Sequence, residues 1–289
     1  RRATCPIVVG GSTGRQTIME PRQPDAVMLA GDWHGNLPWA FKALNYAKYR
    51  GADTVLQVGD FGFWRDTYAT EQYLREVQRE CEALDLLLYW VDGNHEDHGR
   101  LEALGAHEVG AEPWCLPHLD RIVHLPRGYR WEWWGDTWMA LGGAASIDRS
   151  FRVEGEGWWP GEFLNEAQSE YALRPGGVDI IVAHDAPSGV NIPGIDPEKD
   201  LWLNVGGMAR RVPDWVMANA KLHRAVIKNI CNFVRPKEFY HGHYHKAYTN
   251  LCELSDGSFM TVRGLDKDDT SMDANTLFIT SGLKDDSDD

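Results

Sequence analysis

The sequence has few of the features that mark secreted or membrane-spanning proteins. Its five cysteines are scattered and form no Cys-x-x-Cys pair, so neither a disulfide framework nor a zinc knuckle is indicated. A reducing, cytoplasmic location is therefore expected. No apolar run approaches the roughly 20 residues that a membrane-spanning helix needs, and the apolar residues 7–9 are too few for the core of a signal peptide. We expect no membrane partner.

Positive charge is also scarce, since acidic residues outnumber Lys and Arg and the formal net charge is -14 at pH 7. Such a chain is a poor candidate for binding extended nucleic acid, because the phosphate backbone has to be neutralised by Lys and Arg. A small anionic substrate remains compatible with this charge, because bound cations would reverse the local field. The sequence leaves the oligomeric state open.

The 289 residues suffice for one large domain or two small ones, and no internal repeat or long linker divides them. Residues 1–24 show no periodicity, and we expect a flexible leader in which residues before Met19 are not native. Residues 25–282 are predicted to form a single domain. Residues 283–289 are predicted to be an acidic, disordered tail.

Apolar strands and amphipathic helices alternate over the first third of the compact region. We expect strands at 26–30, 54–58 and 86–91, and helices at 37–50, 71–84 and 100–104. This alternating order predicts a mostly parallel sheet with right-handed crossovers.

The pattern changes after residue 120. Segments 121–125, 129–134 and 137–141 are predicted to be consecutive antiparallel strands, followed by an aromatic loop at 142–162. Beyond this loop we expect helices at 165–173 and 214–234, an irregular segment at 196–213, and strands at 178–183, 238–240, 248–254, 258–263 and 276–279.

Five short motifs rich in metal-ligand side chains each follow one of the predicted strands. They read Asp32-Trp33-His34, Gly59-Asp60, Gly93-Asn94-His95-Glu96, Ala183-His184-Asp185 and Gly242-His243-Tyr244-His245. The carboxyl ends of strands are where α/β proteins build their sites. Asp, His and Asn supply oxygen and nitrogen ligands suited to Mn, Fe or Zn, and two such ions can share a bridging carboxylate.

In this order, the motifs resemble those of the calcineurin-like metallophosphoesterase family over roughly residues 25–265. Residues 141–162 resemble a stretch found in its small bacterial and phage-type members. Each motif alone is a weak signal, whereas five in order, each after a strand, are a strong one. The resemblance implies an α/β fold: a four-layer α/β/β/α sandwich of two mixed sheets flanked by helices, with a dinuclear metal site at the carboxyl ends of the strands.

The same resemblance implies a role for each motif residue. One metal would take Asp32, His34, Asp60 and His245, and the other would take Asp60, Asn94, His184 and His243, with Asp60 as the bridge. Mn is the expected metal, with Fe, Zn or Ni as alternatives. A bridging water deprotonated by both ions would be the nucleophile, and His95 would be the general acid.

Departures from the family pattern bear on the substrate. Phe63 and Trp64 stand where the protein Ser/Thr phosphatase branch has Asp and Arg, and Asp92 stands where it has Arg. Because an Arg fork suits a terminal phosphate dianion, its absence favours a singly charged phosphodiester. We expect a phosphodiesterase acting on nucleotide-type substrates. A phosphomonoesterase of protein or small-molecule type, a nuclease and a catalytically silent scaffold are the alternatives.

The aromatic loop is a candidate for substrate contacts, because residues 142–143 are glycines that end a predicted strand near the metals. Arg149 or Arg152 would bind a phosphate oxygen, and Trp158 or Trp159 would stack on a base. In the alternative interpretation, Arg149 pairs with an acidic neighbour and the tryptophans pack a surface loop.

Overall fold

Three apolar segments near the start of the chain form adjacent parallel strands. In the computed structural model, which describes residues 9–10, 14–18, 20–195 and 200–281, they are β3 (Ala26–Ala30), β4 (Thr54–Gln57) and β5 (Leu87–Trp90). The helices α1 (Leu37–Tyr49) and α2 (Tyr68–Leu84) connect them, as the alternating pattern predicts. Helix α2 begins three residues before the predicted position because the Thr67 side chain caps it, accepting from the Thr70 backbone N–H.

These strands belong to a sheet of eight strands in the order β1-β2-β6-β7-β5-β4-β3-β16. The further members are β1 (Val9–Gly10), β2 (Gln16–Thr17), β6 (Trp114–Cys115), β7 (Ile122–His124) and β16 (Thr276–Thr280). Strand β16 pairs antiparallel with β3 at one end of the sheet.

A second sheet has six strands in the order β14-β15-β13-β10-β9-β8. Its members are β8 (Arg130–Trp133), β9 (Asp136–Leu141), β10 (Ile180–Ala183), β13 (Glu238–His241), β14 (Tyr248–Glu253) and β15 (Phe259–Gly264). Strands β8 and β9 are antiparallel, as predicted. The prediction that 121–125 continues this antiparallel set is wrong, because β7 pairs parallel with β5 in the first sheet.

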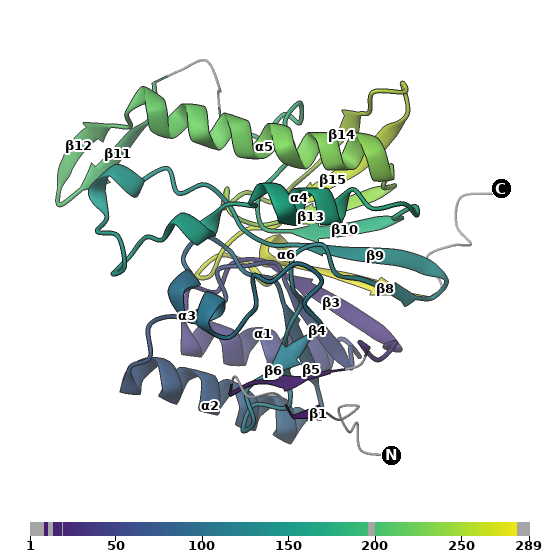
Figure 1. Cartoon of the computed structure of the whole chain (residues 1–289). Helices are drawn as coiled ribbons and strands as arrows, with labels where there is room; N and C mark the ends of the chain where they lie inside the picture. The colour runs from purple at the N-terminus through teal and green to yellow at the C-terminus, as the bar shows by residue number, and fades with distance from the viewer. Residues whose placement is uncertain (1–8, 11–13, 19, 196–199, 282–289) are drawn as a thin grey trace.

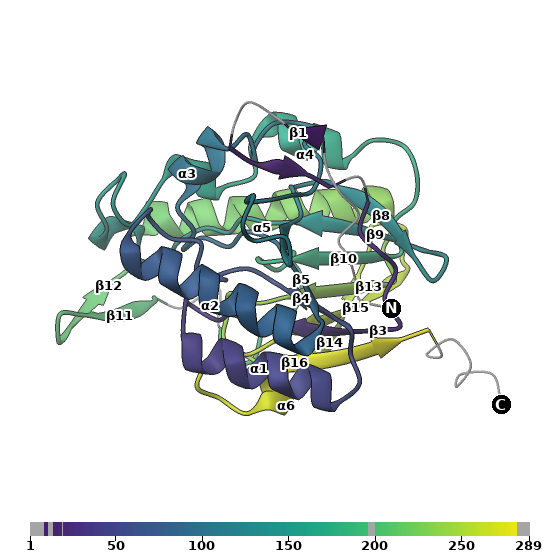
Figure 2. The ribbon, with the colours of Figure 1, turned by 90° about the horizontal axis from the view of Figure 1, so that it is seen from below.

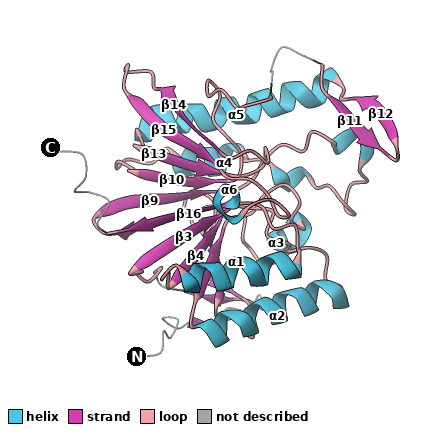
Figure 3. Ribbon diagram, turned by 180° about the vertical axis from the view of Figure 1, so that it is seen from behind, coloured by secondary structure: helices cyan, strands magenta, loops and turns pink. Residues whose placement is uncertain are grey.

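The two sheets pack face to face, and their facing apolar side chains form one core. Val27 and Leu29 of β3 lie in this core with Trp131, Trp133 and Trp138 of the second sheet. Helices α1 and α2 cover the outer face of the first sheet, while α4 (Glu166–Ala172) and α5 (Asp214–Val234) cover the second (Figures 1 and 3). The predicted four-layer α/β/β/α sandwich is therefore confirmed.

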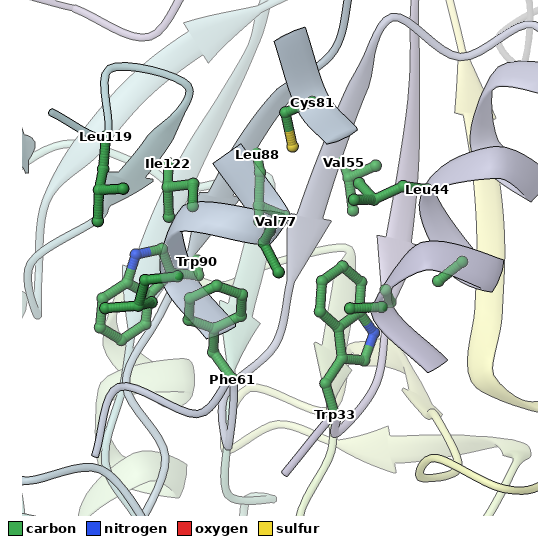
Figure 4. Packing of buried hydrophobic residues seen from close by; sticks show 14 of the residues in the cluster. Trp33, Leu44, Val55, Phe61, Val77, Cys81, Leu88, Trp90, Leu119 and Ile122 are labelled. Atoms are coloured by element: carbon green, nitrogen blue, oxygen red, sulfur yellow. The ribbon is translucent and has the colours of Figure 1, made fainter. Parts of the chain in front are cut away.

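The outer core of the first sheet reaches the ends of the strands. Figure 4 shows Phe61, from the loop after β4, between Trp33 of the loop after β3 and Trp90 of β5. Viewed from below in Figure 2, α1 and α2 lie side by side over this cluster. Buried aromatic residues thus hold the loops that carry the first motifs.

The remaining elements are short. They are α3 (His98–Ala103), the 3-10 turns η1 (Arg149–Phe151) and η2 (Pro160–Glu162), and α6 (Met272–Asn275). Among the helices in the described ranges, none is both long and apolar enough to cross a membrane.

Two predictions about irregular segments need correction. Residues 202–211, expected to be irregular, form a hairpin of β11 (Trp202–Val205) and β12 (Met208–Arg211), joined by Gly206 and Gly207 in left-handed conformations. Residues 16–18, expected to belong to a flexible leader, are part of the fold: β2 pairs with β6, and Ile18 is buried. Met19 and the tail at 283–289 lie outside the described residues, and a single domain bounded at 25–282 stays a prediction.

Candidate metal centre

The five motifs converge at one edge of the two sheets. Asp32 and Asp60 follow β3 and β4, and both carboxylates are buried. The Oδ2 atom of Asp32 lies 3.1 Å from Nε2 of His245. The Oδ2 atom of Asp60 lies 3.6 Å from Nε2 of His34 and 3.3 Å from Nε2 of His184. Asp60 therefore lies between imidazoles that come from both sheets.

The remaining predicted ligands lie around the same centre. The Asn94 side-chain oxygen is 3.2 Å from Nε2 of His184, whose ring centroid is 5.1 Å from that of His243. The backbone N–H of His243 also donates to the Asp32 carboxylate at 3.2 Å. The structure thus brings together all seven residues that the sequence predicted to bind metal.

His95 lies at the same edge, next to Asn94. Its backbone N–H donates to Oδ1 of Asp60 at 2.9 Å, and its Nε2 atom is 3.9 Å from Oδ2 of Asp60. Burial lowers the pKa of His95, while the Asp60 carboxylate opposes this shift and Arg152 adds to it.

The loops that carry the ligands have unusual backbone conformations. His34, Asp60, His243 and His245 all have φ between 47° and 67°, in the left-handed region that these residues seldom adopt. A Cβ atom at Gly93 would lie 2.2 Å from Oδ1 of Asp60, so only glycine fits there. Strained backbone at four candidate ligands is typical of a functional site.

Two imidazoles are held so that Nε2 faces the centre. Nδ1 of His34 lies 2.9 Å from the Asp268 carboxylate, and Nδ1 of His184 lies 2.8 Å from the Val58 carbonyl oxygen. Such contacts fix the tautomer and the orientation of metal-ligating histidines. Sequence reasoning missed Asp268, because it lies more than 200 positions from His34 and has no local motif.

Asn94 is oriented in a similar way. Its side-chain nitrogen donates to Oγ of Ser146 at 3.0 Å, and this hydroxyl donates to the Glu162 carboxylate at 2.5 Å. The Asn94 oxygen is thereby turned toward His184. Burial raises the pKa of Glu162 to about 7. Ser146 and Glu162 lie in the aromatic loop and had no predicted role.

Glu96, the last residue of its motif, holds two of the ligand loops together. Its buried carboxylate accepts hydrogen bonds from the backbone N–H groups of Asp60, Gly62 and Gly93. Burial, followed by the neighbouring Asp60 carboxylate, raises the pKa of Glu96 to about 8. The hydrogen bond from the Asp60 backbone N–H to Glu96 therefore helps to hold Asp60 in position.

The centre favours bound cations. Among the described residues, the ion pairs of Asp32 and Asp60 are all with histidines. Burial opposes a charged imidazole, but the Asp60 carboxylate raises the pKa of His34 to about 9 and that of His184 to about 10. Two ligand groups, Asp32 with His34 and His245, and Asp32 with Asp60 and His184, have atoms within 4.8 Å of one another. This oxygen and nitrogen donor set fits divalent metals.

The predicted substrate residues lie in different places in the structure. Nη2 of Arg152 lies 3.1 Å from Nε2 of His95, which places this guanidinium beside the centre. Arg149 instead lies over the ring of Trp158, with its Cζ atom 3.7 Å from the ring centroid, and near Trp215. Trp158 is buried under this contact. Of the two tryptophans proposed to stack on a base, Trp159 rather than Trp158 lines the pocket beside His95.

That pocket has a volume of about 330 Å³. His95 and Arg152 line its side toward the metal centre, and Trp64, Arg65 and Trp159 are also in its wall. In the sequence, Trp64 is notable only because it stands where the protein Ser/Thr phosphatase branch has Arg. In the structure, Trp64 lines this cavity.

Comparison with known proteins finds one family model and several similar structures. A family model described as calcineurin-like phosphoesterase matches residues 26–247. One crystal structure matches with a TM-score of 0.51 at 13% identity, covering 89% of this chain and 99% of its own. TT1561 of Thermus thermophilus matches with a TM-score of 0.45 at 14% identity, covering 90% and 100%. A dimetal phosphatase from Danio rerio matches with a TM-score of 0.46 at 13% identity, covering 89% and 92%. No curated protein sequence matches.

Proposed function

The chain belongs to the calcineurin-like phosphoesterase family, whose members hydrolyse phosphoester bonds, and we propose that it is a dinuclear metal-dependent phosphodiesterase acting on small nucleotide-type substrates. The observation that carries this proposal is the position of Asp60. Its carboxylate is buried, and histidines of three different motifs lie within 4 Å of one oxygen. An anion so placed is suited to bridge two dications that would otherwise repel each other.

In this proposal each metal has four protein ligands. One metal takes Asp32, His34, Asp60 and His245, and the other takes Asp60, Asn94, His184 and His243. When bound, the two dications activate water and the phosphoryl group as Lewis acids. We propose Mn as the native metal, with Fe, Zn or Ni as alternatives, since all suit this nitrogen and oxygen donor set.

His95 is the proposed general acid. In the free site Arg152 donates toward Nε2 of His95, because a guanidinium has no acceptor. An arriving phosphate would attract Arg152 to its own oxygens and leave Nε2 of His95 able to carry a proton to the leaving oxygen. His95 and Arg152 thus alternate between contacting each other and contacting the substrate.

The proposed preference for diesters comes from the cations that face the site. Arg152 is the guanidinium in hydrogen-bond contact with His95, which suits the single negative charge of a diester. Arg65 lines the same pocket, and a second cation there favours the alternative of a phosphomonoesterase. The net charge of -14 weighs against a nuclease, and the convergence of all predicted ligands weighs against a catalytically silent scaffold.

We also propose a reducing, cytoplasmic location. Three cysteines within the described residues, Cys81, Cys231 and Cys252, are buried and free. Buried free thiols fit a compartment in which disulfides do not form.

The test is the rate at which the Mn-supplemented protein hydrolyses bis-p-nitrophenyl phosphate compared with p-nitrophenyl phosphate. We expect a higher kcat/KM for the diester, and loss of hydrolysis in Asp60→Asn. A higher kcat/KM for the monoester would replace the diesterase with a phosphomonoesterase. Absence of hydrolysis of both compounds by the metal-loaded protein would contradict the enzymatic proposal.

A further inference from the structure

We propose that the pocket beside His95 binds the nucleobase of a nucleoside monophosphate unit, with Trp64 and Trp159 as its aromatic surfaces. This inference rests on the proposed function, because it places the phosphate of that unit at the metal centre. It adds a recognition site for the part of the substrate that does not react.

The position of the pocket fits this arrangement. His95 belongs to its wall and also contacts Asp60, since its backbone N–H donates to that carboxylate at 2.9 Å. A ligand whose phosphate lies at the metals would therefore extend past His95 into the pocket. Its volume of about 330 Å³ is at the lower end of the range of roughly 300–1,000 Å³ for small-molecule sites. That size suits one nucleoside rather than a longer strand.

The two indole rings that line the pocket come from different parts of the chain. Trp64 lies between β4 and α2, and Trp159 immediately precedes η2. Trp64 is 40% exposed although its ring is held against Gly35, where an added Cβ would lie 2.9 Å from the ring. Trp159 is held in a comparable way, with Nε1 3.1 Å from a Cβ placed on Gly99.

A tryptophan ring that is supported on one side and open on the other is a surface on which a base can stack. Such stacking accepts every base, because each base has a flat π-face.

Polar groups in the same wall argue against a purely aliphatic ligand. Glu156, Thr67 and Thr70 are among the residues that line the pocket. The two threonine hydroxyls are 3.1 Å apart and share one hydrogen bond, and Oγ1 of Thr67 also accepts from the Thr70 N–H. Since a hydroxyl can make three hydrogen bonds, bonding capacity remains. An alkyl group would cover these atoms without bonding to them, at a cost in free energy, whereas amino groups and hydroxyls of a nucleoside can bond to them.

The first experiment is isothermal titration calorimetry of the Mn-loaded protein with AMP and with ribose 5-phosphate, which share the phosphate and the sugar. We expect AMP to bind about tenfold more tightly, the size of effect that stacking of one base gives. Equal dissociation constants for the two compounds would overturn the proposal.

Variants then test whether the tighter binding of AMP comes from the rings of Trp64 and Trp159. Trp64→Ala and Trp159→Ala should each remove part of this preference of about tenfold and leave ribose 5-phosphate binding unchanged, and the double variant should bind the two compounds equally. Trp64→Phe, which keeps an aromatic face, should restore most of the affinity for AMP. Trp202→Ala in β11, where the side chain is 58% exposed and outside the pocket, is the matched control and should bind both compounds normally. Equal weakening of both compounds in Trp64→Ala and Trp159→Ala would contradict a base-binding role.

The two proposals can fail separately. A protein that hydrolyses bis-p-nitrophenyl phosphate but binds AMP and ribose 5-phosphate equally would retain the proposed function and lose the base pocket. A protein that prefers AMP tenfold but hydrolyses no diester would retain the base pocket and lose the diesterase assignment.

Discussion

Arg127 and Asp92 form a buried ion pair in which two guanidinium nitrogens share one carboxylate oxygen. Nε and Nη2 of Arg127 lie 2.9 Å and 2.6 Å from Oδ2 of Asp92, and both side chains are almost fully buried. Arg127 also donates to the carbonyl oxygens of Gly161 and Phe163. Asp92 comes two residues before Asn94, so this pair joins the end of β5 to the segment around η2.

Breaking this pair should destabilise the fold strongly. Arg127→Met removes the cation but leaves the Asp92 carboxylate buried, and we expect a loss of about 3–5 kcal/mol in the free energy of unfolding. Urea unfolding at pH 7 measures this loss. The matched control is Arg79→Ala, which breaks the exposed pair with Glu76 and should cost less than about 1 kcal/mol. Similar losses in the two variants would show that Arg127 is not a structural cation.

Substitutions of Asp60 and of His95 should have different effects on metal content and hydrolysis. Asp60→Asn removes the shared anion, so we expect mass spectrometry to find both metals depleted and hydrolysis abolished. His95→Ala should keep both metals while kcat falls roughly 10²–10⁴-fold, the usual contribution of a general acid. Equal metal loss in the two variants would make His95 a ligand or a structural residue instead.

Ser146 should act through Asn94. Ser146→Ala removes the hydroxyl that accepts from the Asn94 amide, so the amide is free to rotate and the Mn affinity should fall about 10–100-fold. Calorimetric titration of the metal-free protein with Mn measures this affinity. Ser169→Ala in α4, where the hydroxyl bonds to a backbone carbonyl, is the control and should bind Mn normally. Unchanged affinity in Ser146→Ala would limit Ser146 to packing.

The two loop arginines should differ in their effect on catalysis. Arg152→Gln removes the guanidinium beside His95, and kcat/KM should fall about tenfold or more, as expected for a charged hydrogen bond. Arg149→Ala should leave kcat/KM within about twofold and lower the unfolding temperature instead, because Arg149 packs on Trp158. The opposite order of effects on kcat/KM would restore Arg149 as the phosphate-binding residue.

Acid should destabilise the fold partly through two buried histidines. Burial, followed by the charge of Arg127, lowers the pKa of His98 to about 3 and that of His107 to about 2. Both are neutral in the folded protein, whereas in the unfolded chain they bind protons below the ordinary histidine pKa of 6.5. Stability is therefore lost as the pH falls below 6.5, by up to about 1.4 kcal/mol per pH unit for each histidine.

His107→Gln tests this pH dependence because it removes one of the two groups. Urea unfolding of the metal-free protein between pH 7 and pH 4 should show a slope that is shallower by about 1.4 kcal/mol per pH unit. Metal removal is needed because the ligands also release metal in acid. Parallel pH profiles for His107→Gln and the unaltered protein would exclude His107 as a source of acid sensitivity.

The sequence predicted most of the strands and the convergence of the motifs because these depend on local patterns. Apolar runs followed by Asp, Asn or His place the ligands at strand ends, and the order of the strands brings those ends together. The β11–β12 hairpin was missed although Gly206-Gly207 between two short runs is a hairpin signal. Neither of its strands has a buried residue, so the usual alternation of apolar and polar positions is weak.

Other features could not be read from local patterns. The parallel pairing of β7 with β5 is a contact between segments distant in sequence, and residues 121–125 contain no local signal for it. The pocket is made by Trp64 and Trp159, which are distant in sequence and meet only in the folded chain. The same holds for Asp268, whose contact with His34 joins residues near opposite ends of the domain.

The contact between Asp268 and His34 forms only after most of the chain has been synthesised. A nascent chain that has left the ribosome as far as residue 247 already contains every proposed metal ligand. It still lacks Asp268, which orients His34 and whose backbone N–H donates to the Asp32 carbonyl at 2.8 Å. It also lacks Asn275, whose carbonyl oxygen accepts from the Gly31 N–H at 2.8 Å. The loop that carries Asp32 and His34 therefore gains its full set of hydrogen bonds only after β16 has paired with β3, later in synthesis than the ligands themselves appear.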